Sequence, residues 1–311
     1  MKKNTALGSS LLLFLTASIW GMAFVSQSKG MEYMHPFTFN GVRSLIGSLS
    51  LVVYMALTGK LKKGAFTKAQ WKQNIKAGLL CGLALTAATT LQQFGLLYTT
   101  VGKAGFITTL YIIFVPLAGI FIGKKVPGIV WGAAAMAAVG MYLLCMTESL
   151  VLGTGDTMVF ICAVLFAMHI LIIDHFAPQT DGVVVSCIQF LLCAVVCMAG
   201  AFLWGEPTFS QILSGKWALL YAGVMSCGVA YTLQIVAQKG INSTVAALIM
   251  SLESVVAAVA GWAAYRIGLL STDQTLTVPQ ILGCAIVFAA VILVQLPAEW
   301  FAKSGKSKKA A

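Results

Sequence analysis

The sequence predicts an all-α membrane protein of ten transmembrane helices, arranged as two five-helix repeats of inverted topology. Three observations predict this class. The 311 residues are 59% hydrophobic and only 9% charged, whereas a soluble domain carries about 25% charged residues. The apolar residues fall into runs of about 20, the length that crosses a bilayer as a helix. The basic residues cluster in alternate links between these runs.

Ten apolar runs are the expected membrane-spanning helices. Pro36, Pro127 and Pro279 mark helix starts, because the first helical turn does not need the N–H that proline lacks. The longest link carries Thr67 as a candidate N-cap and Trp71 at interfacial depth. The first run is too long for a signal peptide and is taken as a span. The expected spans are 7–26, 36–58, 77–98, 103–123, 127–147, 154–174, 182–204, 217–238, 243–265 and 278–297.

The distribution of basic residues tests this count of spans. With ten spans and both termini inside, fifteen lysines lie on the inner side and four basic residues on the outer side. Arg43 lies within a span and completes the twenty Lys and Arg. The positive-inside rule predicts this asymmetry for a multi-pass protein of the cell (inner) membrane with cytoplasmic termini. The net charge of +11 therefore reflects topology and lipid contact, and nucleic acid is not an expected partner.

Metal, disulfide and cofactor chemistry are not expected. The eight cysteines all lie in apolar runs, and none forms a CxxC pair with metal-ligand spacing. They are interpreted as small buried residues. The sequence lacks the HExxH, GxSxG, P-loop and Rossmann patterns. We therefore expect neither an enzyme nor a pump that uses ATP through this chain alone.

The two halves of the chain resemble each other. Ala17–Met22 aligns with Ala163–Met168, and Gln92 aligns with Gln234. Because each half holds an odd number of spans, the second half enters the membrane from the opposite side, as in many secondary transporters. A structural membrane protein that retains an old gene duplication is the alternative. The expected units are a first repeat at 7–147, a second repeat at 154–297 and a basic cytoplasmic tail at 298–311.

Four segments, taken in order, resemble segments of one transporter family. Ile19–Val25 is similar to a W-G-x-x-F-V opening, and His35–Arg43 to a P-x-x-x-x-x-x-R start of the second span. Leu97–Val101 resembles the link before the fourth span, and Ser251–Val255 resembles an L-E-P-V element in the ninth. The family is the EamA family of the drug/metabolite transporter (DMT) superfamily, and the resemblance covers nearly the whole chain.

The sequence departs from this family at three sites. Gly123-Lys124 and Tyr265-Arg266 stand where the family often has Gly-Glu, and Ser254 replaces the usual Pro. The resemblance implies ten spans and transport of small organic metabolites, frequently the efflux of amino-acid-like compounds. It does not fix the solute, because members of the family differ widely.

Glu253 is the only carboxylate deep within an expected span. Ionisable residues inside a membrane are costly, and they usually face a cavity or a partner. In a functional role, Glu253 carries a proton or binds a cationic group of the solute. In the alternative role, hydrogen bonds hold the carboxylate and it only fixes helix packing.

Arg43 lies about two turns into the second span, on the outer side of the expected topology. It can bind a solute carboxylate or phosphate through paired hydrogen bonds. It can instead bond nearby carbonyls or extend outward to water. The sequence also leaves open an ion pair between Arg43 and Glu253.

A stripe of polar side chains is expected to line the cavity. Tyr231, Gln234 and Gln238 share one face of the eighth span by their i, i+3, i+7 spacing, and Gln92 is the repeat mate of Gln234. The alternative for these residues is hydrogen bonding between helices, which is common in membrane bundles.

Three ring side chains complete the candidate site. Trp20 and Tyr111 are candidates for stacking on a solute ring, with core packing as the alternative. His169 is a candidate proton relay because histidine titrates near neutral pH, with a structural hydrogen bond as the preferred interpretation.

These residues predict a secondary transporter that exports a small organic metabolite, amino-acid-like or drug-like, by alternating access around a midplane cavity. A proton is the expected coupling ion, and membrane lipids and a second copy of the chain, in a homodimer, are the other partners considered. The alternatives are a passive facilitator of the same fold, a membrane-embedded enzyme and a non-transporting subunit. An enzyme would need paired carboxylates or a metal set, and only one deep carboxylate is present.

Overall fold

The computed structural model describes residues 2–121, 123, 126, 128–145, 153–271 and 273–295. These residues form helices and short links, with no strand among them. Pro127, Lys124, Lys125 and the expected tail at 298–311 lie outside the described residues. The all-helical class that the composition predicts is therefore confirmed for the described part of the chain.

The first half of the chain forms six helical segments. They are α1 (Lys2–Gly30), α2 (Pro36–Leu57), α3 (Lys68–Gly95), α4 (Val101–Thr109), α5 (Tyr111–Phe121) and α6 (Gly128–Cys145). The second half begins with α7 (Thr154–Phe176) and α8 (Gly182–Gly200), joined by the 3-10 turn η1 (Ala177–Gln179). The remaining segments are η2 (Ala201–Gly205), α9 (Phe209–Ser214), α10 (Lys216–Leu220), η3 (Tyr221–Ala230), α11 (Tyr231–Ala237), α12 (Ser243–Met250), α13 (Leu252–Arg266) and α14 (Val278–Gln295).

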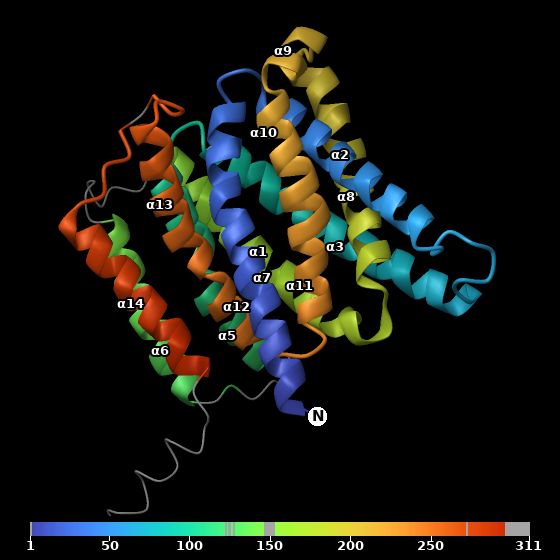
Figure 1. Ribbon diagram of the computed structural model, residues 1–311, viewed down its shortest axis with the longest axis horizontal. Helices are drawn as coiled ribbons and strands as arrows, with labels where there is room; N and C mark the ends of the chain where they lie inside the picture. The colour runs from blue at the N-terminus through green and yellow to red at the C-terminus, as the bar shows by residue number, and fades with distance from the viewer. Residues whose placement is uncertain are drawn as a thin grey trace, which may run out of the picture.

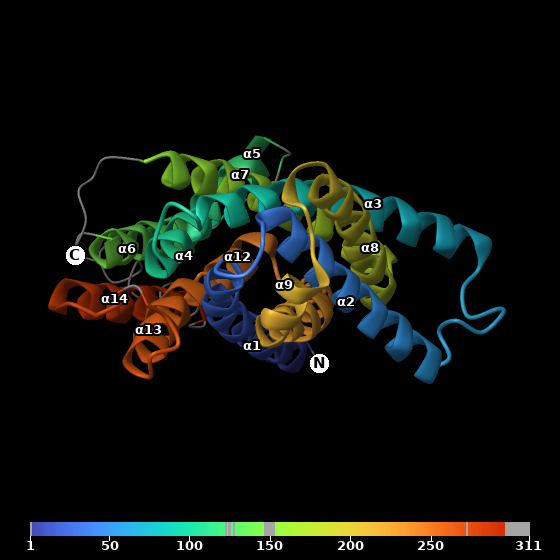
Figure 2. The ribbon, with the colours of Figure 1, turned by 90° about the horizontal axis from the view of Figure 1, so that it is seen from above.

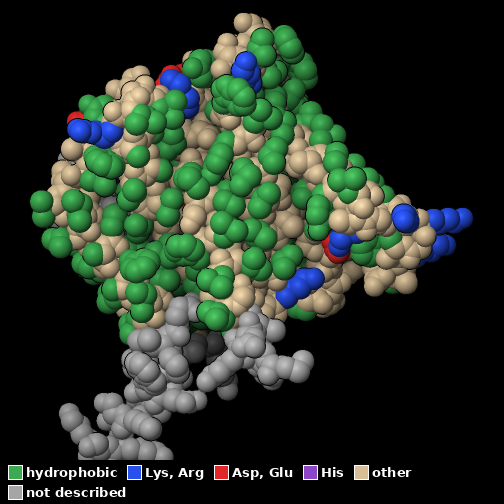
Figure 3. Space-filling view, viewed as in Figure 1, with side chains coloured by type: hydrophobic (Ala, Val, Ile, Leu, Met, Phe, Trp, Pro, Cys, Tyr) green, Lys and Arg blue, Asp and Glu red, His purple; other side chains and the backbone are tan. Residues whose placement is uncertain are grey.

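Within the described residues, eight helical stretches are long and apolar enough to cross a membrane. Two shorter apolar helices, Gly128–Gly140 and Val278–Leu293, fall where the fifth and tenth spans are expected. The face in Figure 3 is apolar through its middle, and its charged side chains gather toward the ends of the bundle. This distribution is typical of a multi-pass membrane protein, whose lipid-facing surface is apolar.

Capping residues set the starts of α2 and α3. The Thr67 hydroxyl accepts the backbone N–H of Gln70, and the Gln70 side chain accepts the N–H of Thr67, which confirms Thr67 as an N-cap. This capping box starts α3 at Lys68, so the helix begins before the apolar span expected from residue 77. The polar residues of the link extend the helix beyond the apolar run, because helix propensity does not require lipid. Pro36 is the first residue of α2, as expected.

Two of the expected spans are broken near their middle. The fourth is divided at Leu110 into α4 and α5, and the ninth is divided at Ser251 into α12 and α13. At each break a hydroxyl bonds a carbonyl of the preceding turn, Thr109 Oγ1 to Phe106 O at 2.8 Å and Ser251 Oγ to Leu248 O at 2.7 Å. Such local bonds compete with the helical ladder and bend it. The ninth span therefore breaks without the proline that the family often carries.

Helices from the two halves interleave in the bundle. The helix α2 packs on α8, and α6 packs on α14 at one edge (Figure 1). The helix α3 contacts α7 and α8, while η3 contacts α1 and α2. Seen from above, α6 and α14 lie side by side at one end of the molecule, and nearer its middle α1 of the first half lies against α12 and α13 of the second (Figure 2). The contacts of α3 with α7 and α8 thus correspond to those of η3 with α1 and α2.

Glycines bring the central helices into close contact. A Cβ on Gly47 of α2 would lie 2.9 Å from the Gly223 carbonyl oxygen, and one on Gly223 would lie 2.9 Å from the Arg43 carbonyl oxygen. A Cβ on Gly21 of α1 would lie 2.8 Å from the Glu253 carbonyl oxygen. Small residues permit such approach in membrane bundles. The backbones that carry Arg43 and Glu253 are therefore held by direct contact with a neighbouring helix.

Candidate functional site

A polar cavity lies in the shared centre of the bundle. Its free volume is about 30 Å³, enough for roughly two water molecules when one needs about 10–15 Å³. The cavity in this conformation is therefore too small for a molecule much larger than water. Its lining residues are Trp20, Phe24, Gln27, Arg43, Gln92, Thr108, Tyr111, Phe166, His169, Ile170, Ser226, Tyr231, Gln234 and Glu253.

Glu253 enters the cavity from the first turn of α13 and is 3% exposed. The Tyr111 hydroxyl, at the first residue of α5, donates a hydrogen bond of 3.2 Å to its Oε1 atom. The break at Ser251 places the start of α13 inside the bundle, and the positive end of a helix dipole favours a carboxylate there. The second half-helices of the two broken spans thus meet through Tyr111 and Glu253.

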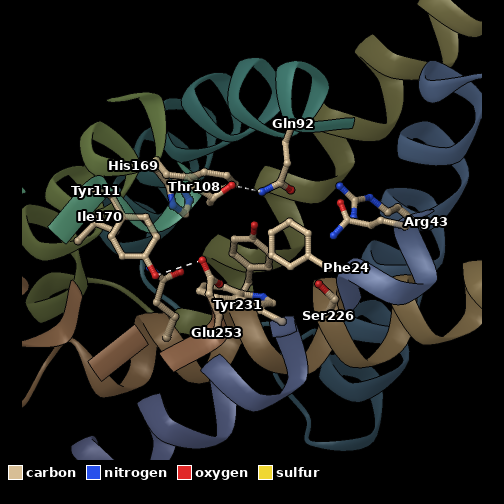
Figure 4. A pocket seen from close by; sticks show the side chains of 14 residues that line it. Phe24, Arg43, Gln92, Thr108, Tyr111, His169, Ile170, Ser226, Tyr231 and Glu253 are labelled. Carbon is tan, nitrogen blue, oxygen red and sulfur yellow. Dashed lines mark hydrogen bonds between the residues drawn. The ribbon is translucent and has the colours of Figure 1, made fainter. Parts of the chain in front are cut away.

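Arg43 reaches the cavity from α2 and is 4% exposed. Its guanidinium carbon lies 5.4 Å from the centre of the Phe39 ring, one turn earlier on the same helix. Figure 4 shows Arg43 and Glu253 extending toward the cavity from different sides. Among the described residues, no ion pair joins them. The pair that the sequence left open is therefore absent from the described part of the chain in this conformation.

Several buried polar atoms at the cavity have no hydrogen-bond partner among the described residues. Such atoms are rare in folded proteins, because an unpaired buried donor or acceptor costs about 1–3 kcal/mol. Five of the cavity-lining residues contribute one each. They are Trp20 Nε1, Gln27 Oε1, Arg43 Nε, His169 Nδ1 and Gln234 Oε1. The cavity therefore offers both donors and acceptors to a polar occupant.

Aromatic rings form one wall of the cavity around Tyr231. The ring of Tyr231 lies 4.6 Å from that of Trp20, and 5.1 Å from that of Phe190 in an edge-to-face contact. His169 packs edge-on against the same ring at 5.9 Å. Trp20 therefore both packs against a neighbouring ring and lines the cavity.

His169 forms a hydrogen bond with Gln189 of α8. Its Nε2 atom lies 3.1 Å from Oε1 of Gln189, which is fully buried. Because a carbonyl oxygen only accepts, His169 donates Nε2–H and keeps a lone pair on Nδ1. A Cβ on Gly82 of α3 would lie 3.0 Å from the Gln189 Cα, so close helix packing fixes this residue. The hydrogen bond to Gln189 thus leaves Nδ1 as the imidazole nitrogen without a partner among the described residues.

The structure brings together eight of the nine residues singled out from the sequence. Gln238 is the exception, because its amide donates a hydrogen bond of 3.3 Å to the Ile170 carbonyl instead of lining the cavity. Gln92 lines the cavity and donates to the Thr108 hydroxyl at 3.1 Å. Sequence reasoning missed Phe24 and Gln27 as lining residues. They stand four and seven residues after Trp20, so all three share one face of α1.

Two partly buried ion pairs lie at opposite ends of α3, a helix of 28 residues and about 42 Å. Before its start, Lys60 pairs with Asp181, the N-cap of α8. Beyond its end, Lys103 Nζ lies 2.8 Å from Asp156 Oδ2, and the Thr99 hydroxyl donates to Oδ1 at 2.9 Å. These pairs join different helices on the two sides of the cavity.

Comparison with known proteins agrees with this architecture. A protein of Archaeoglobus fulgidus, named an uncharacterized transporter, is 29% identical over 295 residues, 93% of this chain and 86% of that protein. YoaV of Bacillus subtilis, also named an uncharacterized transporter, is 22% identical over 287 residues, 88% of this chain and 92% of its own. A solved crystal structure of another protein shares the fold, with a TM-score of 0.70 and 16% sequence identity. The match covers 92% of this chain and 96% of the other protein's chain.

The sequence profile of the EamA-like transporter family matches the chain twice, at residues 7–146 and at residues 153–296. The two matches together span nearly all of the membrane helices. The resemblance seen in the four sequence segments is thereby confirmed, and the chain belongs to the EamA-like transporter family.

Proposed function

We propose that this protein is a secondary transporter that moves a small organic metabolite by alternating access around the central cavity. One observation carries the proposal: Arg43 and Glu253 are buried without an ion pair between them, in a cavity whose walls come from both halves of the chain. Charges inside a membrane are costly and usually mark a solute or ion pathway. An amino-acid-like solute suits the site, because the cavity presents unpaired donors and acceptors.

The proposal includes ten spans built as two inverted five-helix repeats. Two features support it. The family profile matches each half separately, and the contacts of α3 with α7 and α8 correspond to those of η3 with α1 and α2. Two like units in opposite orientation supply two conformations of similar energy, which is what alternating access requires.

We further propose that both termini are cytoplasmic, that the protein lies in the cell membrane, and that it works as an exporter. The excess of lysine in the links assigned to the inner side supports the orientation. The Lys60–Asp181 and Lys103–Asp156 pairs are both formed in this conformation, so one of them would have to open for the cavity to reach the inner side and the other for it to reach the outer side. Catalysis is not proposed, because a single deep carboxylate does not provide the paired groups that a membrane-embedded enzyme needs.

Glu253 is the proposed site of proton coupling. Its carboxylate has one oxygen held by Tyr111, and its position in the first turn of α13 lets it gain or lose a proton without leaving the cavity. A proton and a cationic group of the solute would compete for it, which couples their movements. A passive facilitator of the same fold would lack this competition.

The test combines a metabolite panel with a vesicle assay. Metabolites retained in cells that express the wild type are compared with those retained in cells that lack the protein, and solutes that differ are then followed in proteoliposomes under a pH gradient. Wild type should concentrate the solute against its gradient, Glu253→Gln should only equilibrate it, and the exposed control Glu206→Gln should match the wild type. A wild type that equilibrates solute with no response to pH would be a facilitator, and no solute difference in any comparison would contradict transport.

A further inference from the structure

Arg43 is the one Lys or Arg side chain among the residues that line the cavity. Arginine stays charged under all conditions in proteins, so its position fixes a positive charge there. The guanidinium carbon lies over the Phe39 ring, 5.4 Å from its centre. The planar edge with its N–H donors is left to contact other groups.

This charge has no partner in the described part of the chain. No carboxylate lies within ion-pair distance of Arg43, and its buried Nε–H has no acceptor. An unpaired buried charge costs several kcal/mol, far more than a surface charge. A site that retains such a charge needs an anion to offset it.

Two lysines near helix ends, unlike Arg43, do have a carboxylate partner. Lys60 pairs with Asp181 and Lys103 with Asp156, although both lysines are more exposed than Arg43. Two neighbours of Arg43 on α2 do bond to other helices: the Asn40 amide N–H donates to Thr89 O at 3.0 Å, although its Oδ1 has no partner among the described residues, and the Ser44 hydroxyl donates to the Cys193 sulfur at 3.3 Å. Helix packing is thus achieved without Arg43, whose donors remain free.

We propose that Arg43 is the anion-binding subsite of the cavity and that it takes a carboxylate of the transported solute. This rests on the proposed function, and it names the chemical class of the solute. A carboxylate matches the fork of the guanidinium with two parallel N–H···O bonds. The Phe39 ring, 5.4 Å from the guanidinium carbon, adds an apolar contact on the same helix.

The charge balance of the cavity favours a carboxylate over a phosphate. Arg43 supplies one positive charge, and Glu253 lines the same cavity. A phosphate monoester near neutral pH carries a charge of about −1.5 to −2, which one guanidinium cannot neutralise. A monocarboxylate leaves no excess charge at the Arg43 end, and its planar shape requires less widening of the small cavity.

The chain suits a direct binding test, because it contains two arginines, Arg43 and Arg266. Arg266 is exposed and serves as an internal control. Protein labelled with ¹⁵N-arginine in phosphatidylcholine nanodiscs is titrated with sodium formate, sodium phosphate and sodium chloride, and Arg266→Lys assigns the signals. Formate should shift the Arg43 Nε–H signal in a saturable way, at a concentration at least about tenfold below that of chloride, and should leave Arg266 unchanged.

Three results would overturn the assignment: no saturable shift of Arg43, an equal response to chloride, or phosphate saturating the site before formate does. The binding test does not depend on transport. If formate binds but no metabolite panel reveals transport, the subsite stands and the proposed function fails. If a solute without a carboxylate is transported and formate does not bind, the transporter stands and the carboxylate subsite fails.

Discussion

The Tyr111 hydroxyl and the Glu253 carboxylate join two half-helices at a hydrogen-bond distance of 3.2 Å in the middle of the bundle. Both residues are buried, so this bond is shielded from water. Removing the donor leaves the Glu253 Oε1 atom without that partner. Hydrogen bonds to charged groups contribute about 1.5–3 kcal/mol, so this contact should be measurable in both stability and transport.

Tyr111→Phe tests this contact. We expect the free energy of unfolding to fall by about 1–3 kcal/mol, and solute transport to fall with it, because Glu253 loses its fixed position. Thermal denaturation in detergent micelles and uptake into proteoliposomes measure the two effects. Tyr54→Phe is the matched control, since Tyr54 is 49% exposed. Equal behaviour of the two variants would contradict a role for the Tyr111 hydroxyl.

The Lys103–Asp156 ion pair should contribute more to stability than the Lys29–Glu32 pair. The side chain of Asp156 is 5% exposed and that of Glu32 is 40% exposed. Breaking a buried pair costs about 3–5 kcal/mol, whereas an exposed pair contributes about 0–1 kcal/mol. Because Lys103 is 17% exposed, we expect Asp156→Asn to cost about 2–3 kcal/mol.

Chemical denaturation of Asp156→Asn and Glu32→Gln in the same detergent measures the difference. Hydrogen exchange at the start of α4 and of α7 should rise in Asp156→Asn alone, because the pair joins these two helix ends. A loss below 1 kcal/mol would mean that the pair does not hold them together.

Gly21→Ala should displace the backbone that carries Glu253. The added Cβ would lie 2.5 Å from Val256 Cβ and 2.8 Å from the Glu253 carbonyl oxygen, so α1 and α13 must separate. Overpacking of this kind costs about 1–3 kcal/mol. Gly8→Ala, on the same helix, has no atom within 4 Å and should be neutral or slightly stabilising. Thermal stability and transport of the two variants decide whether the close contact matters.

Gln189 should control the tautomer of His169. The chain has three histidines, so ¹⁵N-histidine spectra are simple enough to assign with a His169→Asn variant. We expect Nε2 of His169 to carry the proton in the wild type, and a mixture of tautomers in Gln189→Leu. A His169 spectrum that is identical in the two proteins would show that Gln189 does not orient the ring.

His35 should make the start of α2 sensitive to acid. Its side chain accepts the Phe37 N–H at 3.3 Å, and burial lowers the pKa of the His35 imidazole below its usual value of about 6.5. The unfolded chain therefore binds the proton more readily than the folded one, so stability falls as the pH drops below about 6.5. His35→Asn keeps a capping side chain and should reduce this loss, as measured by denaturation between pH 7.5 and pH 5, a range chosen to bracket about 6.5.

Much of the fold was accessible from the sequence because lipid imposes simple rules. Apolar runs gave the main helices, and Thr67 gave a helix start through its side-chain chemistry. The helix α3 begins at Lys68, ahead of the apolar span expected from residue 77, because a helix in water follows propensity rather than hydropathy. The breaks at Leu110 and Ser251 were missed because they depend on hydroxyl bonds to the local backbone.

The sequence predicted eight of the residues that line the cavity, but not how their side chains lie relative to one another. Polar residues in apolar spans converge on one place because each is too costly to face lipid. Whether Arg43 pairs with Glu253, and whether Gln238 reaches the cavity, depends on helix rotation and separation. These quantities follow from contacts between distant segments, such as the approach of Gly47 to Gly223, which a single sequence does not specify.

The breaks at Leu110 and Ser251 divide two of the expected membrane spans into half-helices. The half-helices that begin after these breaks carry Tyr111 and Glu253. If the helices turn about these two positions, Tyr111 and Glu253 move with the half-helices that they begin. In the mechanism proposed above, gain or loss of a proton at Glu253 would change the Tyr111–Glu253 hydrogen bond between these half-helices.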